Sequence, residues 1–269
     1  MKTQIQIGPL VTDVCMFAGM PDFASAIETV TCEPSDSDWA GASRAETVQR
    51  ARAGDPSRVA PSDALLGMIE TALDLSSLAR ASVPAVAGGV PVVPAFLAGS
   101  PVSMRARRKV TSPRGEVALF VSQFVSHQVK ADTIARRGAA VLALARALAM
   151  VRPVALYAYT ASRSRDRAIA SLTLVRLDSA PLDLARAAWM LSAPEALRQG
   201  AVKLHKDMQG KAWTNGTPIE GHDTPRAIAD LLGVESYVAT PDLFSTTGDF
   251  SSDESALAWV QSNLATHTA

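Results

Sequence analysis

Residues 116–160 read EVALFVSQFVSHQVKADTIARRGAAVLALARALAMVRPVALYAYT, and this stretch decides the fold. Its run at 117–121, VALFV, is continuously apolar, which is typical of a strand buried on both faces. An amphipathic helix then begins at Asp132, the residue that we expect to cap it, and continues to about Met150. The run at 154–159 is a second buried strand. This order predicts neighbouring parallel strands in an α/β fold.

The following residues extend the same pattern. Residues 168–175 form a third strand, and the short polar turn before them predicts an antiparallel hairpin. Further helices are expected around 181–191, 224–233 and 251–264, with a short strand at 235–239, whereas 193–222 is polar and broken. Residues 111–269 are therefore predicted to form one domain, a mostly parallel sheet flanked by helices with one antiparallel edge.

Residues 1–110 are predicted to form a separate, helical N-terminal region that carries a proline-rich arm. Ser43 and Glu46 have the spacing of a capping box, and Gly54 is expected to end that helix in the left-handed conformation. Ser62 is expected to cap a second helix, which continues to residue 80.

The arm, residues 83–101, is apolar but holds four prolines and the pair Gly88-Gly89. Prolines at this density forbid a continuous ladder or helix, so we expect an extended segment. Such a segment needs a surface on which to bury its side chains, either its own core or a partner subunit. We therefore expect self-association or a protein partner through 84–101. The side chains concerned are Val86, Val90, Val92, Val93, Phe96 and Leu97.

A basic segment follows at 105–114, which we expect to be a loop. Its cations would neutralise nucleic-acid phosphates, an attraction that falls steeply with salt. No aromatic residues alternate with them, so any contact is to the phosphate backbone. The alternative is a solvated loop, or one that pairs with the acidic stretches near 33–38 and 249–254. The nucleic-acid-binding candidates are Arg105, Arg107, Arg108, Lys109 and Arg114, joined by Arg163 and Arg165 of the hairpin turn.

Composition adds few constraints on function. The 26 Lys and Arg residues balance 26 Asp and Glu residues, so there is no global attraction to nucleic acid or membrane. Cys15 and Cys32 match no zinc or redox motif, and we expect two reduced thiols. Without a secretion signal or an apolar run long enough to cross a bilayer, we expect a cytoplasmic protein with no membrane partner.

Motifs for catalysis are weak. No glycine-rich phosphate loop follows a strand, and no two histidines have metal-ligand spacing. Ser126, His127 and Asp132 lie where open α/β sheets place ligands, at the end of the first buried strand. They lack the strained nucleophile turn of a hydrolase, so a polar rim is the favoured interpretation.

The order of elements, with the helix pattern RGAAxxALxxAL at 137–148, resembles a von Willebrand factor A-like domain. The segments 39–46, 86–104 and 250–260 also resemble an uncharacterised family encoded by tailed bacteriophages. That likeness implies a phage-encoded protein in the host cytoplasm or the virion, and it brings no known activity.

In A domains, Asp-x-Ser-x-Ser after the first strand binds a divalent cation together with a later Thr and Asp. The matching stretch here, 122–126, is SQFVS, in which Ser122 replaces the Asp and only Ser126 fits, with Asp242 as a distant candidate. A hard cation needs several anionic oxygens. We therefore expect no metal and no cofactor, and a crevice formed by Ser122, Ser126, His127 and Asp242.

These observations favour a non-enzymatic binding or assembly protein that acts through protein–protein contacts. The alternatives are a nucleic-acid-associated protein that uses 105–114, and a hydrolase at the strand-end crevice.

Overall fold

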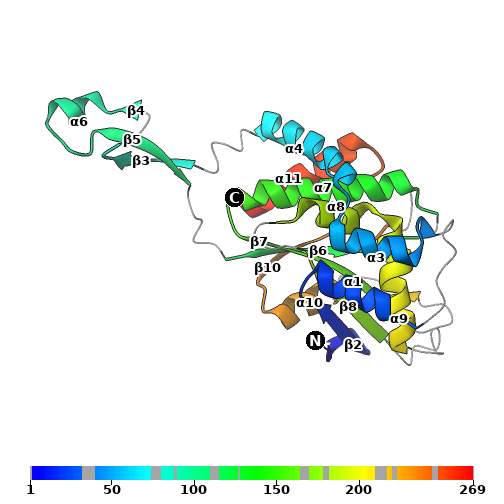
Figure 1. The fold of residues 1–269 in the computed structure, drawn as a ribbon. Coiled ribbons are helices and arrows are strands. Elements are labelled where there is room, and N and C mark those ends of the chain that lie inside the picture. Colours follow the sequence, from blue (N-terminus) through cyan, green and yellow to red (C-terminus); the bar gives the residue numbers. More distant parts are fainter. Residues whose placement is uncertain are drawn as a thin grey trace.

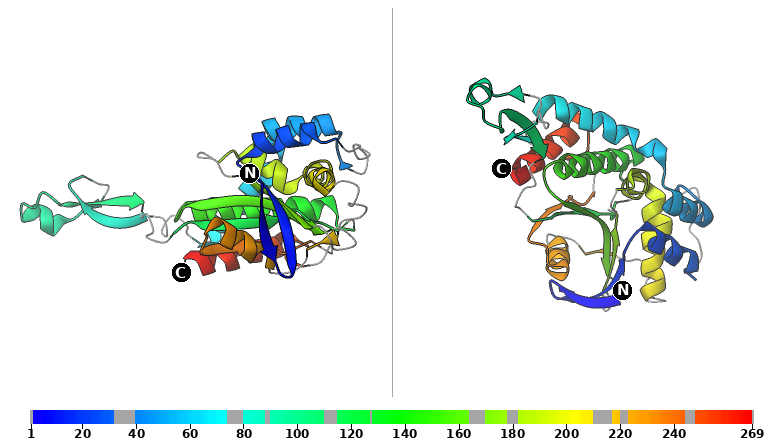
Figure 2. Two further views of the ribbon diagram at one scale, coloured as in Figure 1. Left: turned by 90° about the horizontal axis from the view of Figure 1, so that it is seen from below. Right: turned by 60° about the vertical axis from the view of Figure 1, so that its left-hand side comes forward.

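The computed structural model describes residues 2–31, 40–73, 80–87, 90–109, 115–126, 128–163, 170–177, 182–209, 217–219, 223–243 and 248–268. They form an α/β body and an arm that projects from it (Figure 1). Figure 2 shows in two further views that the arm extends away from the body.

The body is built on one sheet, in which six strands have the order β1-β2-β8-β7-β6-β10 and the short β9 pairs with β7. Its strands are β1 (Lys2–Ile7), β2 (Leu10–Phe17), β6 (Val117–Ser122), β7 (Val154–Arg163), β8 (Ala170–Arg176), β9 (Thr217–Pro218) and β10 (Ser236–Ala239).

Strand directions make the sheet mixed. β10, β6 and β7 are parallel, β7 and β8 form the predicted antiparallel hairpin, β2 is parallel to β8, and β1 is antiparallel to β2. The α/β class is therefore correct, but the prediction of a mostly parallel sheet with one antiparallel edge is wrong. The reason is the N-terminal hairpin, which adds two strands beyond β8 and places the antiparallel β7–β8 pair inside the sheet.

Helices cover both faces of this sheet. They are α1 (Met20–Thr29), α3 (Arg44–Ala53), the 3₁₀ turn η1 (Pro56–Arg58), α4 (Ala60–Leu73), α7 (Ala131–Ala149), α8 (Leu184–Ser192), the π-helical η2 (Ala196–Ala201), α9 (Val202–Gln209), α10 (Asp223–Leu232) and α11 (Asp253–Thr268).

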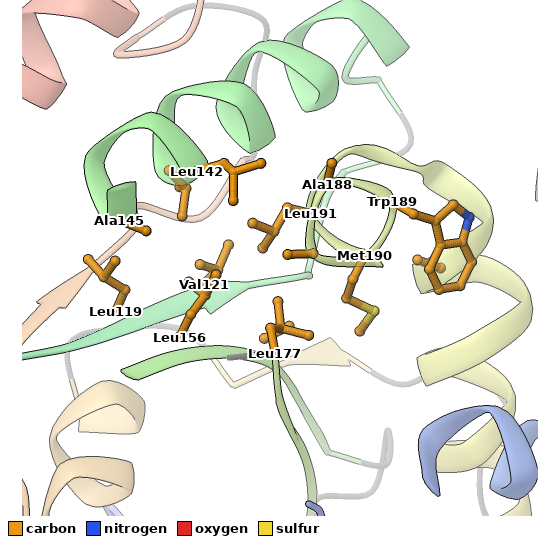
Figure 3. Close-up of a cluster of buried hydrophobic side chains, with 14 of the residues drawn as sticks. Leu119, Val121, Leu142, Ala145, Leu156, Leu177, Ala188, Trp189, Met190 and Leu191 are labelled. Atoms are coloured by element: carbon orange, nitrogen blue, oxygen red, sulfur yellow. The ribbon is translucent and has the colours of Figure 1, made fainter. Parts of the chain in front are cut away.

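The central strand β6 is buried along its whole length, because alternate side chains enter two cores. Leu119 and Val121 belong to the larger core, where Leu142 of α7 and Leu191 of α8 cover the sheet (Figure 3). On the other face Ala118 and Phe120 pack in a second core with Ile228 of α10. Removing either helical layer exposes one face of this strand to water, so the sheet depends on both layers.

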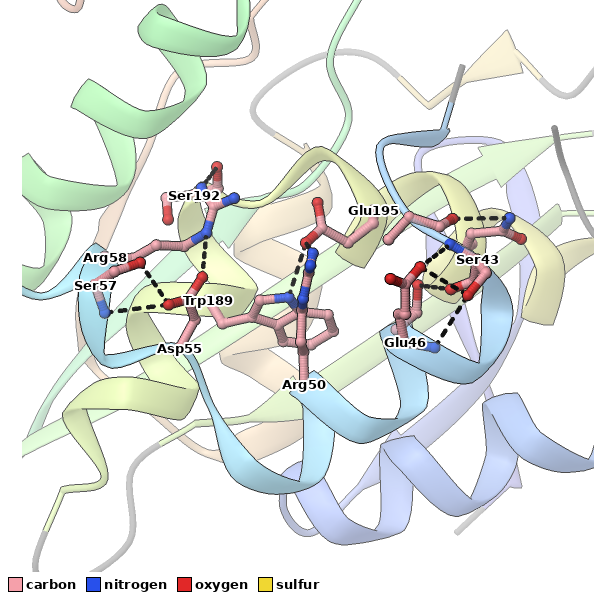
Figure 4. A network of polar contacts seen from close by, with 12 residues as sticks. Ser43, Glu46, Arg50, Asp55, Ser57, Arg58, Trp189, Ser192 and Glu195 are labelled. Atoms are coloured by element: carbon pink, nitrogen blue, oxygen red, sulfur yellow. Dashed lines mark hydrogen bonds and ion pairs between the residues drawn. The ribbon is translucent and has the colours of Figure 1, made fainter. Parts of the chain in front are cut away.

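The segment 193–222, predicted to be polar and broken, instead contains two buried helices, η2 and α9. Its polar residues are buried because distant elements satisfy them. Glu195, only 1% exposed, accepts hydrogen bonds from Arg50 Nη1 at 2.7 Å and from Trp189 Nε1 at 3.2 Å (Figure 4). These contacts join α3 of the N-terminal region to α8 and η2.

Helix α3 begins at the predicted capping box and ends at the predicted glycine, in a conformation that differs from the prediction. Ser43 and Glu46 form a reciprocal capping box, in which the Glu46 carboxylate accepts from the Ser43 N–H at 2.8 Å (Figure 4). Gly54 ends the helix at φ +77° with ψ −177°, an extended ψ rather than the left-handed helical one that we expected.

Other predicted caps are wrong by one or two residues. Lys130 rather than Asp132 is the N-cap of α7, and Ser62 lies inside α4 with its hydroxyl donating to the Val59 carbonyl at 2.7 Å. At the start of α11, predicted near residue 251, reciprocal bonds join Ser252 and Ser255. Sequence motifs of four residues fit adjacent registers equally well, and packing selects one.

The arm is a small antiparallel sheet of order β3-β5-β4 with a short helix, built from β3 (Arg80–Ala85), β4 (Val90–Pro91), α6 (Val93–Leu97) and β5 (Met104–Lys109). The prolines did not prevent a ladder, because Pro84 and Pro91 lie on the two outer strands. The prediction of a basic loop is also wrong, because residues 105–109 form most of the central strand β5.

The close approach of α7 to α8 predicts a strict requirement for Gly138. A Cβ at this position would lie 2.8 Å from the Leu191 carbonyl oxygen, a backbone atom with little freedom to move. We expect Gly138→Ala to lower the free energy of unfolding by about 1–3 kcal/mol, measured by urea denaturation.

Gly67 is the matched control, because it is exposed within α4 and a Cβ there meets no atom within 4 Å. Gly67→Ala is expected to leave stability unchanged or to raise it by up to about 1 kcal/mol. Equal effects of the two substitutions would contradict the packing described here.

Candidate functional site

The arm presents large apolar side chains to solvent. Phe96 and Leu97 at the end of α6 are 69% and 78% exposed, and Val86 is 72% exposed. Val93 and Val102 on the same arm are 57% and 41% exposed. In the structure the body of the same chain buries none of these five side chains, and the arm extends away from it (Figure 1). Exposed apolar patches of this kind mark interaction sites.

Cations concentrate on the same arm. Residues 80–109 contain five of the 26 Lys and Arg residues and none of the Asp and Glu residues. Four of the five are on β5 (Arg105, Arg107, Arg108 and Lys109), and the fifth, Arg80, pairs with Lys109 across the β3–β5 ladder. The arm is therefore a strongly basic part of a chain that is neutral overall.

The remaining basic candidates do not extend this surface. Arg114 and Arg165 lie outside the described residues. Arg163 is the last residue of β7, at the carboxyl end of the parallel strands, whereas the arm precedes the amino end of β6. Arg163 and the arm are therefore at opposite edges of the sheet.

The carboxyl end of the sheet brings three of the four crevice candidates together. The Ser122 N–H donates to Thr240 Oγ1 at 3.2 Å, and the Ser126 N–H donates to the Leu243 carbonyl at 2.8 Å. Asp242 lies between these two contacts in the segment that follows β10. The fourth candidate, His127, is outside the described residues. The candidates were chosen by their resemblance to the A-domain motif, and the parallel β6 and β10 bring them to the same edge because both strands end there.

Sequence reasoning missed two residues of this edge, Arg137 and Tyr159. Arg137 of α7 is fully buried, and none of its guanidinium nitrogens has a hydrogen-bond partner among the described residues. Burial lowers the pKa of Arg137 to about 10, while the nearby carboxylate of Asp242 acts in the opposite direction. Burial likewise raises the pKa of Tyr159, whose side chain hydrogen-bonds Ser122. The sequence signal that could have identified Arg137 is its position within the apolar pattern of helix α7.

Arg137 and Asp242 therefore interact electrostatically at this edge. The guanidinium of Arg137 beside Asp242 opposes the binding of a second cation, since like charges in a poorly solvated site repel strongly. At the predicted hydrolytic group, Ser126 Oγ accepts a long bond, 3.4 Å, from the Gln128 N–H, and Asp132 is exposed in the first turn of α7. Among described residues, no base polarises Ser126.

A second buried polar cluster lies under α9. Nδ1 of His205 is 2.5 Å from Ser171 Oγ and 3.2 Å from Ser162 Oγ, two residues that face each other across β7 and β8. Burial lowers the pKa of His205 to about 4. All three side chains are at most 1% exposed, so the cluster has no route to a substrate and acts as a structural contact.

His205 predicts a pH-dependent stability. Its folded pKa lies below the unfolded value of about 6.5, so stability is complete above that value and is lost as the pH falls toward about 4. We expect the free energy of unfolding to fall by about 3 kcal/mol over this window, by chemical denaturation at several pH values.

His205→Asn is expected to flatten this slope between pH 5 and 6.5, where few carboxylates titrate. His267→Asn is the control, because that side chain is only partly buried on α11 and its pKa is lowered by burial to a smaller extent. An unchanged slope in His205→Asn would show that another group causes the loss.

The fold and these sites define an α/β protein with a mixed sheet and a projecting apolar and basic arm. A family model described as a domain of unknown function, DUF7192, matches residues 14–242, so the chain belongs to that family. The match includes the arm and the strands β6, β7, β8 and β10. No curated protein and no solved structure matches the chain.

Two features of the described residues bear on membranes and metals. None of their helices is both long and apolar enough to cross a membrane. In the same part of the chain, His, Cys, Asp and Glu side chains form no group of three that is able to hold a metal ion.

Proposed function

We propose that this protein is a non-enzymatic assembly protein whose arm, residues 80–109, binds a second copy of the chain. The observation that carries the proposal is the exposure of Phe96, Leu97 and Val86 on a projecting element. Full burial of one such side chain contributes about 1.5–3 kcal/mol. Together they supply the apolar centre that a stable interface needs.

Charge complementarity favours another copy of the chain as the partner. The chain is neutral overall, and the arm holds five cations without an acid, so the other residues together have five more acids than bases. One copy therefore offers a net negative surface to the arm of the next. Complementary fields of this kind steer association and fix its orientation.

Two finer expectations belong to the same proposal. The parallel strands β10, β6 and β7 with the β7–β8 hairpin support a von Willebrand factor A-like body in which the Arg137–Asp242 pair replaces a metal site. The likeness of three segments to a tailed-phage family supports a role in phage particles or their assembly. Detection of the protein in purified particles by mass spectrometry tests that role.

Self-association through the arm is the first test. We expect wild-type protein to exceed the monomer mass of 28.3 kDa in light scattering at micromolar concentrations. The double variant Phe96→Asp/Leu97→Asp is expected to be monomeric, because it places two carboxylates in the apolar contact. Circular dichroism of both proteins checks that the fold is retained.

Met68→Asp is the control, because Met68 is 51% exposed on α4 of the body and is not part of the proposed contact through the arm. It is expected to assemble like the wild type. A wild-type protein that stays monomeric up to high micromolar concentration overturns the proposed function.

A second candidate function is binding to nucleic-acid backbone, favoured by the four cations on β5. Filter binding of a labelled duplex at two salt concentrations tests it. Wild-type retention should fall steeply with salt, and Arg107→Glu/Arg108→Glu should lose it at low salt. Retention that is equal in wild type and variant removes this function. Phe96→Ser/Leu97→Ser separates the two candidates, because it removes the apolar contact without changing the charge of the arm.

A further inference from the structure

Three buried polar side chains without hydrogen-bond partners lie near the carboxyl end of β6. They are Arg137 of α7, Gln123 just after β6 and Thr160 of β7, which are 0%, 3% and 2% exposed. The three guanidinium nitrogens of Arg137, the amide nitrogen of Gln123 and the hydroxyl of Thr160 have no partner among the described residues. Folded proteins leave few buried polar groups in this state, so these atoms require a partner from outside the chain.

The sheet places Gln123 and Thr160 next to each other on the face that α7 covers. Val121 of β6 and Ala158 of β7 are paired, and both belong to the larger core. Because side chains alternate along a strand, the residues two positions further on, Gln123 and Thr160, lie on the same face. The Gln123 N–H donates to the Tyr159 carbonyl at 2.7 Å, which continues the β6–β7 ladder to this point.

Helix α7 brings Arg137 to the same end of the sheet. The helix connects β6 to the parallel strand β7, so it begins at the carboxyl end of β6 and runs back along it. Arg137 lies in the second turn of α7. Helical side chains lean toward the N-terminus of their helix, and Arg137 therefore leans toward the carboxyl edge of the sheet. The electrostatic effects of Asp242 and Tyr159 on Arg137 agree with this position.

The missing partner is a hydrogen-bond acceptor with a negative charge. The nitrogens of Arg137 and Gln123 only donate, so another donor does not satisfy them. A buried cation without a hydrogen-bonded counter-charge is costly, and burial lowers the pKa of Arg137 to about 10. Asp242 reduces this cost through its charge, but it accepts no hydrogen bond from the guanidinium. Water supplies an acceptor without the charge.

We infer that these side chains bind a small carboxylate, whose two oxygens accept from the guanidinium of Arg137 while Gln123 and Thr160 donate beside it. A carboxylate matches the planar guanidinium and balances its single positive charge. A phosphate dianion exceeds that charge and is repelled by Asp242. The site lies at the carboxyl end of β6, whereas the arm precedes its amino end, so the inference does not depend on self-association.

Thermal unfolding of the full chain tests the site with acetate as the probe. The protein is unfolded in urea, dialysed and refolded in chloride, which removes any carboxylate retained from the cell. Sodium acetate then replaces sodium chloride at constant total salt and constant protein concentration. Because unfolding opens the site, stability responds to acetate even when the folded protein encloses it. We expect the wild-type Tm to rise by about 3–5 °C for each tenfold increase in acetate above its Kd.

Two results with the wild type contradict the inference. A Tm that is the same in acetate and in chloride shows that no carboxylate binds. A rise in Tm with inorganic phosphate but not with acetate shows that the assignment to a carboxylate is wrong.

Variants separate a ligand-binding arginine from a structural one. Arg137→Met replaces the cation by an apolar side chain, so its Tm in chloride is expected to equal or exceed that of the wild type, with no response to acetate. Thr160→Val keeps the side-chain shape and is expected to need about tenfold more acetate for the same rise in Tm. Arg146→Met is the matched control on α7, because Arg146 pairs with Asp63, and it is expected to keep the full response.

The inference fails if Arg137→Met responds to acetate like the wild type, because the anion then binds elsewhere. It also fails if this variant folds with a Tm well below that of the wild type in chloride, since Arg137 is then satisfied within the protein. If Arg137→Met does not fold, Thr160→Val decides, and a response equal to that of the wild type refutes the site.

Discussion

The body depends on burying β6 from two sides at once. Alternate residues of this strand enter different cores, so α7 and α8 are required on one face and α10 on the other. On one side of β6, the strands β7 and β8 share this two-sided burial until the sheet reaches the N-terminal hairpin. There the side chains of β1 become polar and partly exposed, and the sheet ends.

The sequence predicts strands well where a continuous apolar run is buried. It predicts elements poorly where polar residues alternate or where distant partners allow polar residues to be buried. The runs 117–121 and 154–159 are apolar throughout, and both are strands. β1 alternates polar residues at the sheet edge, so its pattern has no buried run to detect. The helices η2 and α9 were missed for another reason. Their polar residues, such as His205, are buried only because β7 and β8 supply hydroxyl partners.

Some residues of the candidate sites could be identified from the sequence, and others could not. Ser122, Ser126 and Asp242 were candidates because the resemblance to A domains matches them to the cation motif. Arg137 was not, since a helical pattern does not show that a guanidinium is enclosed beside a carboxylate. The sequence also left open whether the arm packs on its own core or on a partner subunit. An apolar segment has the same composition in both cases, so the exposure of the arm could not be predicted.

The position of Pro84 and Pro91 has a consequence for how such an arm survives at high protein concentration. Each lies on an outer strand of the small arm sheet, and each lacks the N–H that an incoming strand would need. Growth of the sheet by addition of further chains, the route to amyloid-like deposits, is therefore discouraged at both margins. The arm therefore exposes apolar side chains, while its outer strands disfavour the addition of further strands.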